Sequence, residues 1–214
     1  MLDKNGFSIM LCNSAYNEEK ELKYISLLVS KKVDGIIIAL SSEDSKSLKK
    51  INNWGIPYVV FDLPQIKDIE NSVLIDHSLC SYLGTNHLIK NGHEKIIIID
   101  IHRQTKDYSR YITGYIKALN ENGISVNKDL IQETTADILG GYKILKKLLQ
   151  SKIIFTGILA ISDLIAVGVY GGAKKYGLKI PDDISVIGND DIPLAKYLSP
   201  PLTTIYQPKF LIGY

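Results

Sequence analysis

Polar side chains follow several of the short apolar runs in this sequence, at the point where each run ends. If the runs are parallel strands, these side chains meet at one edge of a sheet, where open α/β sheets bind their ligands. A polar cleft at that edge is one interpretation, and a series of separate helix caps is the other. The side chains concerned are those of Ser41, Ser42, Asp62, Ser162, Asp163, Asn189 and Asp190.

Such a cleft suits a sugar or another polyol, because a carboxylate accepts hydrogen bonds from two hydroxyl groups at once and an arginine fork donates to them. Arg110 is the candidate donor, since it opens a predicted helix after a polar loop. The alternative for Arg110 is a solvated side chain at a helix start. Asp163 also opens a predicted helix, and there the cap interpretation fits well.

The sequence contains no pattern typical of catalysis or metal binding. Asp190 and Asp191 are adjacent, so their side chains diverge and make a poor general acid–base pair. The motifs GxSxG and GxGxxG and the P-loop are absent. We therefore expect no enzyme activity, no metal and no cofactor. The histidines lack metal-ligand spacing; they are His77, His87, His93 and His102.

Composition is that of a soluble globular protein of 214 residues, with 45% hydrophobic and 22% charged residues. The net charge of +2 is spread along the chain, which argues against a nucleic-acid surface within it. The first residues carry no apolar leader, and polar residues interrupt the longest apolar region, Ile153–Ala173. Cys12 and Cys80 are far apart and are expected to be reduced thiols. These features predict a cytoplasmic protein without a membrane span.

Apolar runs rich in Ile and Val alternate with amphipathic segments almost throughout, which predicts an α/β fold with doubly wound parallel sheets. Strands are expected at Phe7–Cys12, Gly35–Leu40, Tyr58–Phe61, Val73–Ile75, Lys95–Ile101, Leu130–Gln132, Gly157–Ile161, Ile184–Ile187 and Thr203–Tyr206. Helices are expected at Glu18–Lys31, His77–Asn91, Ser109–Asn122, Asp137–Leu149 and Asp163–Tyr176.

Two segments near the end of the chain resemble the effector-binding core of the LacI/GalR family of bacterial transcription regulators. They are Pro181-Asp-Asp-Ile-Ser-Val-Ile-Gly188 and Pro200-Pro-Leu-Thr-Thr204. Weaker matches, at residues 32–38, 87–93 and 162–168, extend the resemblance over essentially the whole chain.

The resemblance implies a two-lobed fold of the periplasmic-binding-protein-like type I class. The amino-terminal lobe would comprise residues 1–91 and 207–214, and the carboxy-terminal lobe residues 92–206, with the effector between them. It also implies that the chain is truncated at both ends. The first lobe would lack a central strand between Phe7–Cys12 and Gly35–Leu40, which leaves backbone groups unpaired.

Site residues transfer from the family one position at a time. Asp190 occupies the position of the family's effector-binding acid, and Ser162 stands where many members have an asparagine. Gln207 matches a polar residue that faces the cleft in some members, and Arg110 lies near the family's cleft arginine but is offset relative to Gly114. Ala136 replaces the aromatic residue that stacks on the ligand. With Asp62 and Ser41 from the strand-end pattern, Asp190, Arg110, Ser162 and Gln207 complete the expected ligand-binding set.

The function implied by the resemblance is sensing of a small-molecule effector, a sugar or a related compound, by a homodimeric repressor. The family reads operator DNA with an amino-terminal helix-turn-helix domain that this sequence does not contain, so we expect no operator binding by the chain itself. A solute-binding protein of a sugar ABC transporter shares the two-lobed architecture and is the alternative.

Overall fold

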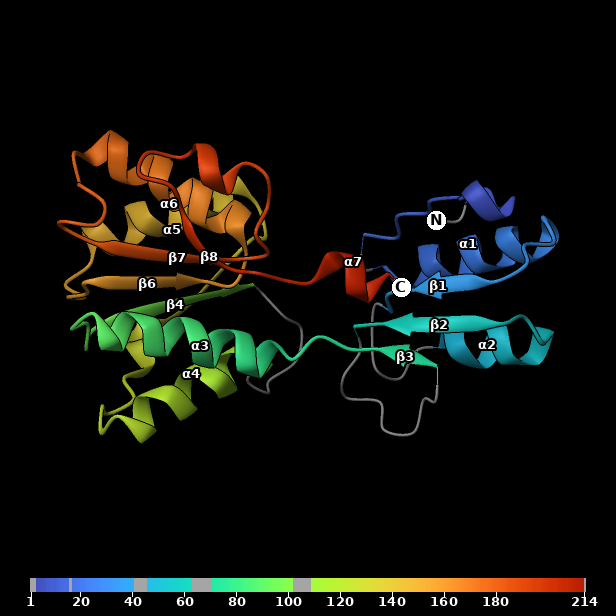
Figure 1. The fold of residues 1–214 in the computed structure, drawn as a ribbon, viewed down its shortest axis with the longest axis horizontal. Coiled ribbons are helices and arrows are strands. Elements are labelled where there is room, and N and C mark those ends of the chain that lie inside the picture. Colours follow the sequence, from blue (N-terminus) through green and yellow to red (C-terminus); the bar gives the residue numbers. More distant parts are fainter. Residues whose placement is uncertain (1–2, 16, 41–45, 63–70, 102–108, 214) are drawn as a thin grey trace. The chain divides into compact units, whose positions relative to one another are not determined.

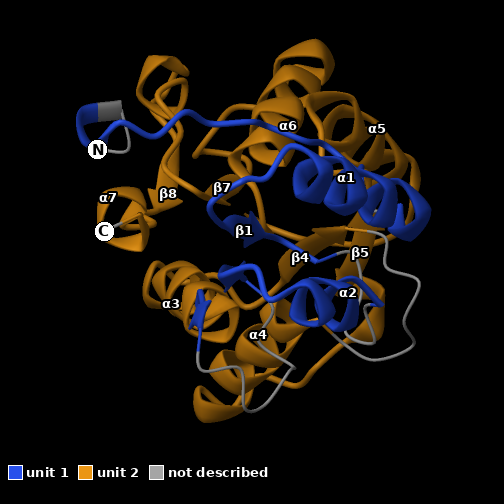
Figure 2. Cartoon of the chain, turned by 90° about the vertical axis from the view of Figure 1, so that its right-hand side faces the viewer, with its two compact units in different colours: residues 1–75 blue, residues 76–214 orange. Residues whose placement is uncertain are grey.

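A computed structural model describes residues 3–15, 17–40, 46–62, 71–101 and 109–213. The chain has the expected α/β class, and all of its paired strands are parallel. It divides into two compact units, Met1–Ile75 and Asp76–Tyr214, which have separate sheets (Figure 2). None of the helices within the described ranges is long and apolar enough to cross a membrane.

The first unit is built on a three-stranded sheet of order β1-β2-β3, and its helices cover a small core. Asn17 caps the first long helix, because its side chain accepts a hydrogen bond from the Lys20 N–H. The elements are the 3₁₀ turn η1 (Asp3–Asn5), α1 (Glu18–Ser30), β1 (Ile36–Ile38), α2 (Lys46–Trp54), β2 (Tyr58–Phe61) and β3 (Ser72–Val73). The core consists of Ile25, Ile36, Ile38, Leu40, Ile51 and Val60.

The strand predicted at Phe7–Cys12 is wrong. The segment has no regular secondary structure, and its apolar side chains lie in solvent: Ile9 is 73% and Leu11 93% exposed. A strand exists only where a neighbour completes its hydrogen-bond ladder, and within the described residues β1 is the edge strand of this sheet, pairing only with β2. Ile37 on β1 is 75% exposed as well.

The second unit is built on a five-stranded sheet of order β5-β4-β6-β7-β8. Helices α3 and α4 cover one face of the sheet, and α5 and α6 cover the other (Figure 1). The strands are β4 (Ile96–Ile101), β5 (Ile131–Thr134), β6 (Gly157–Ala160), β7 (Ser185–Asn189) and β8 (Thr203–Ile205). The helices are α3 (His77–Lys90), α4 (Arg110–Glu121), α5 (Ile138–Gln150), α6 (Asp163–Tyr176) and α7 (Lys209–Ile212), with 3₁₀ turns η2 (Lys128–Leu130) and η3 (Ala195–Tyr197).

Strand β4 lies inside the sheet of the second unit, and helices cover both of its faces. Residues Ile96–Ile99 have no exposed surface, which explains the continuous apolar run in the sequence. Tyr115 on α4 is equally buried, and its hydroxyl donates to the Ile96 carbonyl at 2.9 Å. Burial raises the pKa of this phenol, so it stays a neutral donor.

Helices α5 and α6 pack so closely that glycine is required at their contact. A Cβ atom on Gly141 would lie 2.0 Å from the Ile165 carbonyl oxygen, and one on Gly168 would lie 2.0 Å from the Ile138 carbonyl oxygen. This close approach holds the amino-terminal half of α6, which follows Ser162 and begins at Asp163, against the amino-terminal half of α5.

The two units meet in sequence between Ile75 and Asp76. Helix α3 packs against α4 and the second sheet and so belongs to the second unit. The lobes expected from the resemblance, residues 1–91 with 207–214 and residues 92–206, rest on fold homology rather than on packing. Their boundaries stay a prediction.

Candidate functional site

The loop after β7 leaves the carboxyl edge of the second sheet in an unusual backbone conformation. Asp190 has φ of 125° and Asp191 has φ of 50°, both in a region that residues with a Cβ atom rarely adopt. The Asp190 N–H donates to the Ile205 carbonyl at 3.1 Å, which ties the loop to the end of β8. The chain turns sharply here, at the edge where parallel sheets bind ligands.

Three of the expected site residues come together at this loop. The Asp190 Oδ1 atom accepts a hydrogen bond from Gln207 Nε2 at 3.0 Å. The Ser162 hydroxyl also hydrogen-bonds to the Asp190 carboxylate, while its oxygen accepts from the Leu164 N–H at 3.3 Å and so caps α6. Side chains that follow β6, β7 and β8 thus converge on one carboxylate.

The environment of Asp190 disfavours its ionised form. Burial is the largest cause that raises the pKa of this carboxyl, and the negative charge of Asp163 raises it further. Hydrogen bonds from the Ser162 side chain and the Asp163 backbone lower the pKa, as does the charge of Lys209. A half-buried carboxylate with these few donors gains from further hydroxyl donors, which a polyol supplies.

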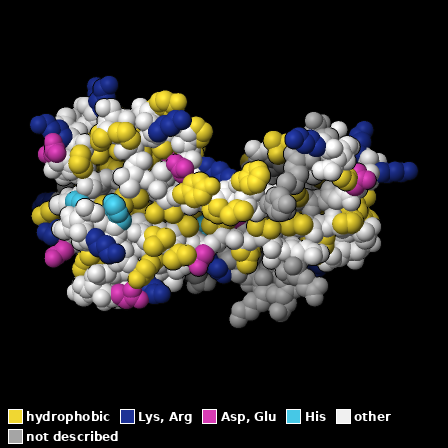
Figure 3. Space-filling view, viewed as in Figure 1, with side chains coloured by type: hydrophobic (Ala, Val, Ile, Leu, Met, Phe, Trp, Pro, Cys, Tyr) yellow, Lys and Arg dark blue, Asp and Glu magenta, His cyan; other side chains and the backbone are white. Residues whose placement is uncertain are grey.

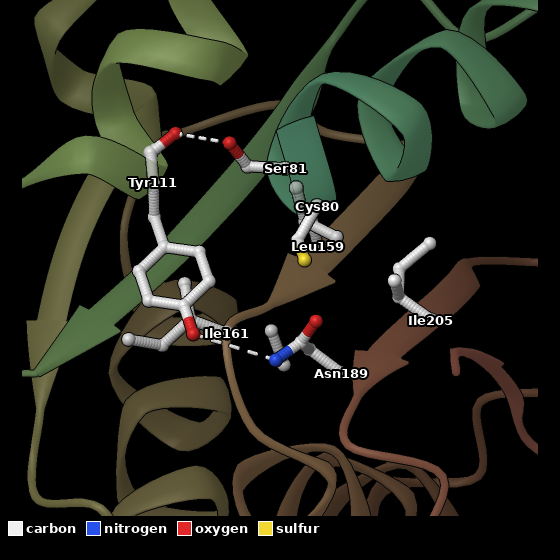
Figure 4. Close-up of a pocket in the computed structure, with 8 residues that line it drawn as sticks. Cys80, Ser81, Tyr111, Leu159, Ile161, Asn189 and Ile205 are labelled. Atoms are coloured by element: carbon white, nitrogen blue, oxygen red, sulfur yellow. Dashed lines mark hydrogen bonds between the residues drawn. The ribbon is translucent and has the colours of Figure 1, made fainter. Parts of the chain in front are cut away.

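Asn189 and Tyr111 continue the polar cluster around Asp190 into the interior of the second unit. They lie beside a small pocket that is also lined by Cys80, Ser81 and Ile161 (Figure 4). Asn189 is 2% exposed, and its Nδ2 atom donates to Asp190 Oδ1 at 3.2 Å and approaches the Tyr111 hydroxyl at 3.4 Å.

Tyr111 itself is held in place from α3. The Ser81 hydroxyl donates to its carbonyl at 2.5 Å, and the His77 ring lies 4.5 Å from its own ring. Asn189 was visible in the sequence as a polar residue at a strand end. Tyr111 gave no such signal, because it follows the apolar pattern of α4.

The other expected site residues have different outcomes. Arg110 is half-buried at the start of α4, and it is the neighbouring Tyr111 whose hydroxyl lies near Asn189. Asp62 belongs to the first unit, where it follows β2 with φ of 55° and its N–H donates to the Val73 carbonyl at 2.8 Å. Ser41, like Ser42, lies outside the described residues. Ala136 is exposed before α5. Arg110, Asp62 and Ser41 stay predictions as effector contacts, and so does the loss of ligand stacking at Ala136.

No group of three or more His, Cys, Asp or Glu side chains in the described part of the chain is placed to hold a metal ion.

Comparison with known proteins places the chain in a family. The family described as periplasmic binding proteins and sugar binding domain of LacI family matches residues 1–214. The HTH-type transcriptional repressor PurR of Glaesserella parasuis is 37% identical over 212 residues, which are 98% of this chain and 62% of the relative. The repressor of the same name from Pasteurella multocida is 36% identical over 214 residues, covering 98% of this chain and 63% of the relative. The chain thus spans a little less than two thirds of these relatives.

Solved structures show the same architecture. A LacI family transcriptional regulator from Enterococcus faecium, with bound ribose, superposes with a TM-score of 0.85 at 32% identity, over 99% of this chain and 77% of that protein. A LacI family regulator from Enterococcus faecalis, also with bound ribose, gives a TM-score of 0.81 at 32% identity, with the same coverage. The expected fold class is confirmed, and the chain belongs to the LacI family of periplasmic-binding-protein-like, sugar-binding domains.

Proposed function

We propose that this chain is the effector-sensing part of a LacI-type transcription regulator, and that its effector is a sugar or a related small molecule. Family membership supports this, together with relatives that are named as repressors and structural neighbours that hold ribose. The observation that carries the proposal is the convergence of Gln207 and Ser162 on the half-buried carboxylate of Asp190.

In the proposed site, the ionised Asp190 accepts hydrogen bonds from two hydroxyl groups of the sugar. Ser162 and Gln207 hold the carboxylate and add polar atoms around it. A charge-assisted hydrogen bond contributes about 1.5–3 kcal/mol, so Asp190 supplies a large part of the affinity. Arg110, Asp62 and Ser41 remain candidate contacts of the same ligand.

Regulation belongs to the whole protein, of which this chain is proposed to be one part. There, effector binding shifts a conformational equilibrium, with a coupling free energy of about 1–3 kcal/mol, and a DNA-binding segment outside this chain reads the operator. A homodimer and a cytoplasmic location, where the DNA lies, complete the proposal. We assign no catalytic step, because the relatives are regulators. The transporter alternative has less support for the same reason.

Replacing Asp190 tests the site. D-ribose is the probe, and isothermal titration and thermal unfolding of the chain are the measurements. Wild type should bind ribose and unfold at a higher temperature when saturated, since about 100-fold excess over Kd adds about 2.7 kcal/mol. Asp190→Asn should weaken binding by about 10- to 100-fold, because the amide lacks the charge that strengthens each hydrogen bond.

The matched control is Asp182→Asn, which removes an exposed carboxylate from the turn before β7. This control should bind ribose like wild type. Equal ribose affinity in Asp190→Asn and wild type would show that Asp190 is not part of the site. If wild type does not bind ribose, ribose is not the effector.

A further inference from the structure

Asp163 is a charged side chain with no exposed surface, at the first position of α6. Its sequence position fits a helix cap, but Ser162 caps this helix instead. A buried carboxylate is unfavourable unless hydrogen bonds satisfy its oxygens. The partners of Asp163 therefore show what this buried charge does.

Both oxygens of the Asp163 carboxylate bind groups outside α6. Oδ2 accepts a hydrogen bond from the Ile192 N–H at 2.8 Å, and Oδ1 accepts one from the Thr204 hydroxyl at 2.6 Å. The Thr204 oxygen in turn accepts from the Asp191 N–H at 3.3 Å. One carboxylate thus joins the 190–192 loop, which follows β7, to strand β8.

Strand β7 leaves room for this carboxylate by carrying a glycine beside it. A Cβ atom on Gly188 would lie 2.1 Å from Asp163 Oδ1. The carboxylate therefore sits directly against the backbone of β7, two residues before Asp190.

The loop needs such a support. Asp190 and Asp191 both have positive φ, a conformation that residues with a Cβ atom keep only when their surroundings hold it. The hydrogen bonds that end on Asp163, directly or through Thr204, are made by the two N–H groups that follow Asp190.

We propose that Asp163 is a positioning residue of the effector site: it clamps the 190–192 loop and so fixes the direction in which Asp190 presents its carboxylate. The inference rests on the proposed function and deepens it. Asp163 touches the loop and not the ligand, so it acts through Asp190.

The charge of Asp163 gives the proposal a distinctive signature. The charged groups that act on Asp190 are Asp163 on α6 and Lys209 on α7, while Asp191 is its neighbour in the loop. Asp163 raises the pKa of Asp190. In Asp163→Asn the amide keeps the shape and an acceptor oxygen but loses the charge, so the pKa of Asp190 should fall. Loss of ribose binding on acidification should then begin at a lower pH than in wild type.

Four variants separate positioning from general stability. Asp163→Ala should weaken ribose binding by about tenfold or more, because it misdirects a charge-assisted acceptor. Asp163→Asn should weaken it less and should shift the acid limb of the binding profile. Thr204→Val, which removes only the bridging hydroxyl, should weaken binding, and Thr204→Ser should restore it.

The matched control is Asp137→Ala, which removes the cap of α5 in the same unit. It should lower the unfolding temperature and leave ribose affinity unchanged. The proposal would be overturned if Asp163→Ala bound ribose with wild-type affinity. It would also be overturned if ribose binding by Asp163→Asn were lost at the same acidic pH as in wild type.

Two measurements without ligand keep this test separate from the proposed function. Hydrogen exchange of the Asp191 and Ile192 amides should speed up in Asp163→Ala and Thr204→Val but not in Asp137→Ala. The carboxyl NMR titration of Asp190 should move to lower pH in Asp163→Asn. If wild type does not bind ribose, the proposed effector fails while these results still decide the clamp. Unchanged exchange and an unchanged titration would refute the clamp whatever the ligand is.

Discussion

His93 joins two strands of the second sheet at their amino ends, on the edge opposite the candidate site. Its Nδ1 atom lies 2.9 Å from the Thr156 hydroxyl, just before β6, and its Nε2 atom lies 2.9 Å from the Ser185 hydroxyl at the start of β7. Burial lowers the pKa of this imidazole, so the folded protein prefers the neutral ring. The interaction therefore depends on pH.

The protonation of His93 in the folded and unfolded chain determines how folding stability changes with pH. Because the folded pKa lies below the unfolded value of about 6.5, the unfolded chain takes up a proton first as pH falls. Stability from His93 should be complete above about pH 6.5 and should decline until the folded pKa is passed. Urea unfolding at pH 7.5 and pH 5 should show a smaller pH difference in His93→Gln than in wild type. His87→Gln, on the exposed face of α3, should keep the wild-type difference.

Residues at strand ends were the part of the site that the sequence could predict. Asp190 and Ser162 follow strands of one parallel sheet, and the topology brings such residues together. Gln207, which bonds to Asp190, was expected only from the family resemblance. Asp163 was interpreted as a cap, since only the structure shows its carboxylate turned toward Ile192 and Thr204. Contacts between elements far apart in the chain leave no periodic trace in the sequence.

At the scale of elements, the fold of the second unit was largely predictable from the sequence. Buried strands appear as short continuous apolar runs, and amphipathic helices repeat their apolar residues every three to four positions. In the first unit one predicted strand is absent and one helix was not predicted. The pattern predicted a strand at Phe7–Cys12 without showing whether a neighbouring strand was there to pair with it. Helix α2 was missed because its sequence is mostly polar and buries only Ser47 and Ile51.

The contact between α5 and α6 gives a prediction with a control in the same helix. Gly168→Ala should destabilise the protein by about 1–3 kcal/mol, because the new methyl group meets the backbone of α5. Gly171→Ala meets nothing within 4 Å, so alanine should stabilise α6 there by up to about 1 kcal/mol. Urea denaturation measures both changes. Equal effects of the two substitutions would contradict the close packing at Gly168.

At the scale of the whole molecule, the two units differ in how much apolar surface they bury. The first has a three-stranded sheet over a small core, and the second has a five-stranded sheet with helices on both faces. Hydrophobic side chains are visible on the surface of both units (Figure 3). In the first unit the exposed ones include residues of the sheet itself, Ile37 and Val59.

This difference predicts unequal stability along the chain. Hydrogen exchange should be faster in β2 of the first unit than in β6 of the second, because local opening is easiest where few apolar contacts are lost. Mass spectrometry of peptides that contain residues 58–61 and 157–160 compares the two strands directly. Equal protection of both peptides would mean that the units unfold as one cooperative body.

The exposed segment Phe7–Cys12 has a consequence for the life of the protein in a cell. It gives a folded chain a local feature of an unfolded one: a mostly apolar stretch without regular secondary structure or acidic side chains, largely exposed to solvent. Holdase chaperones and proteases act on such stretches, and quality control of this kind sets protein abundance. The amount of this chain in a cell should therefore depend on the accessibility of those six residues as well as on the free energy of unfolding of the larger unit.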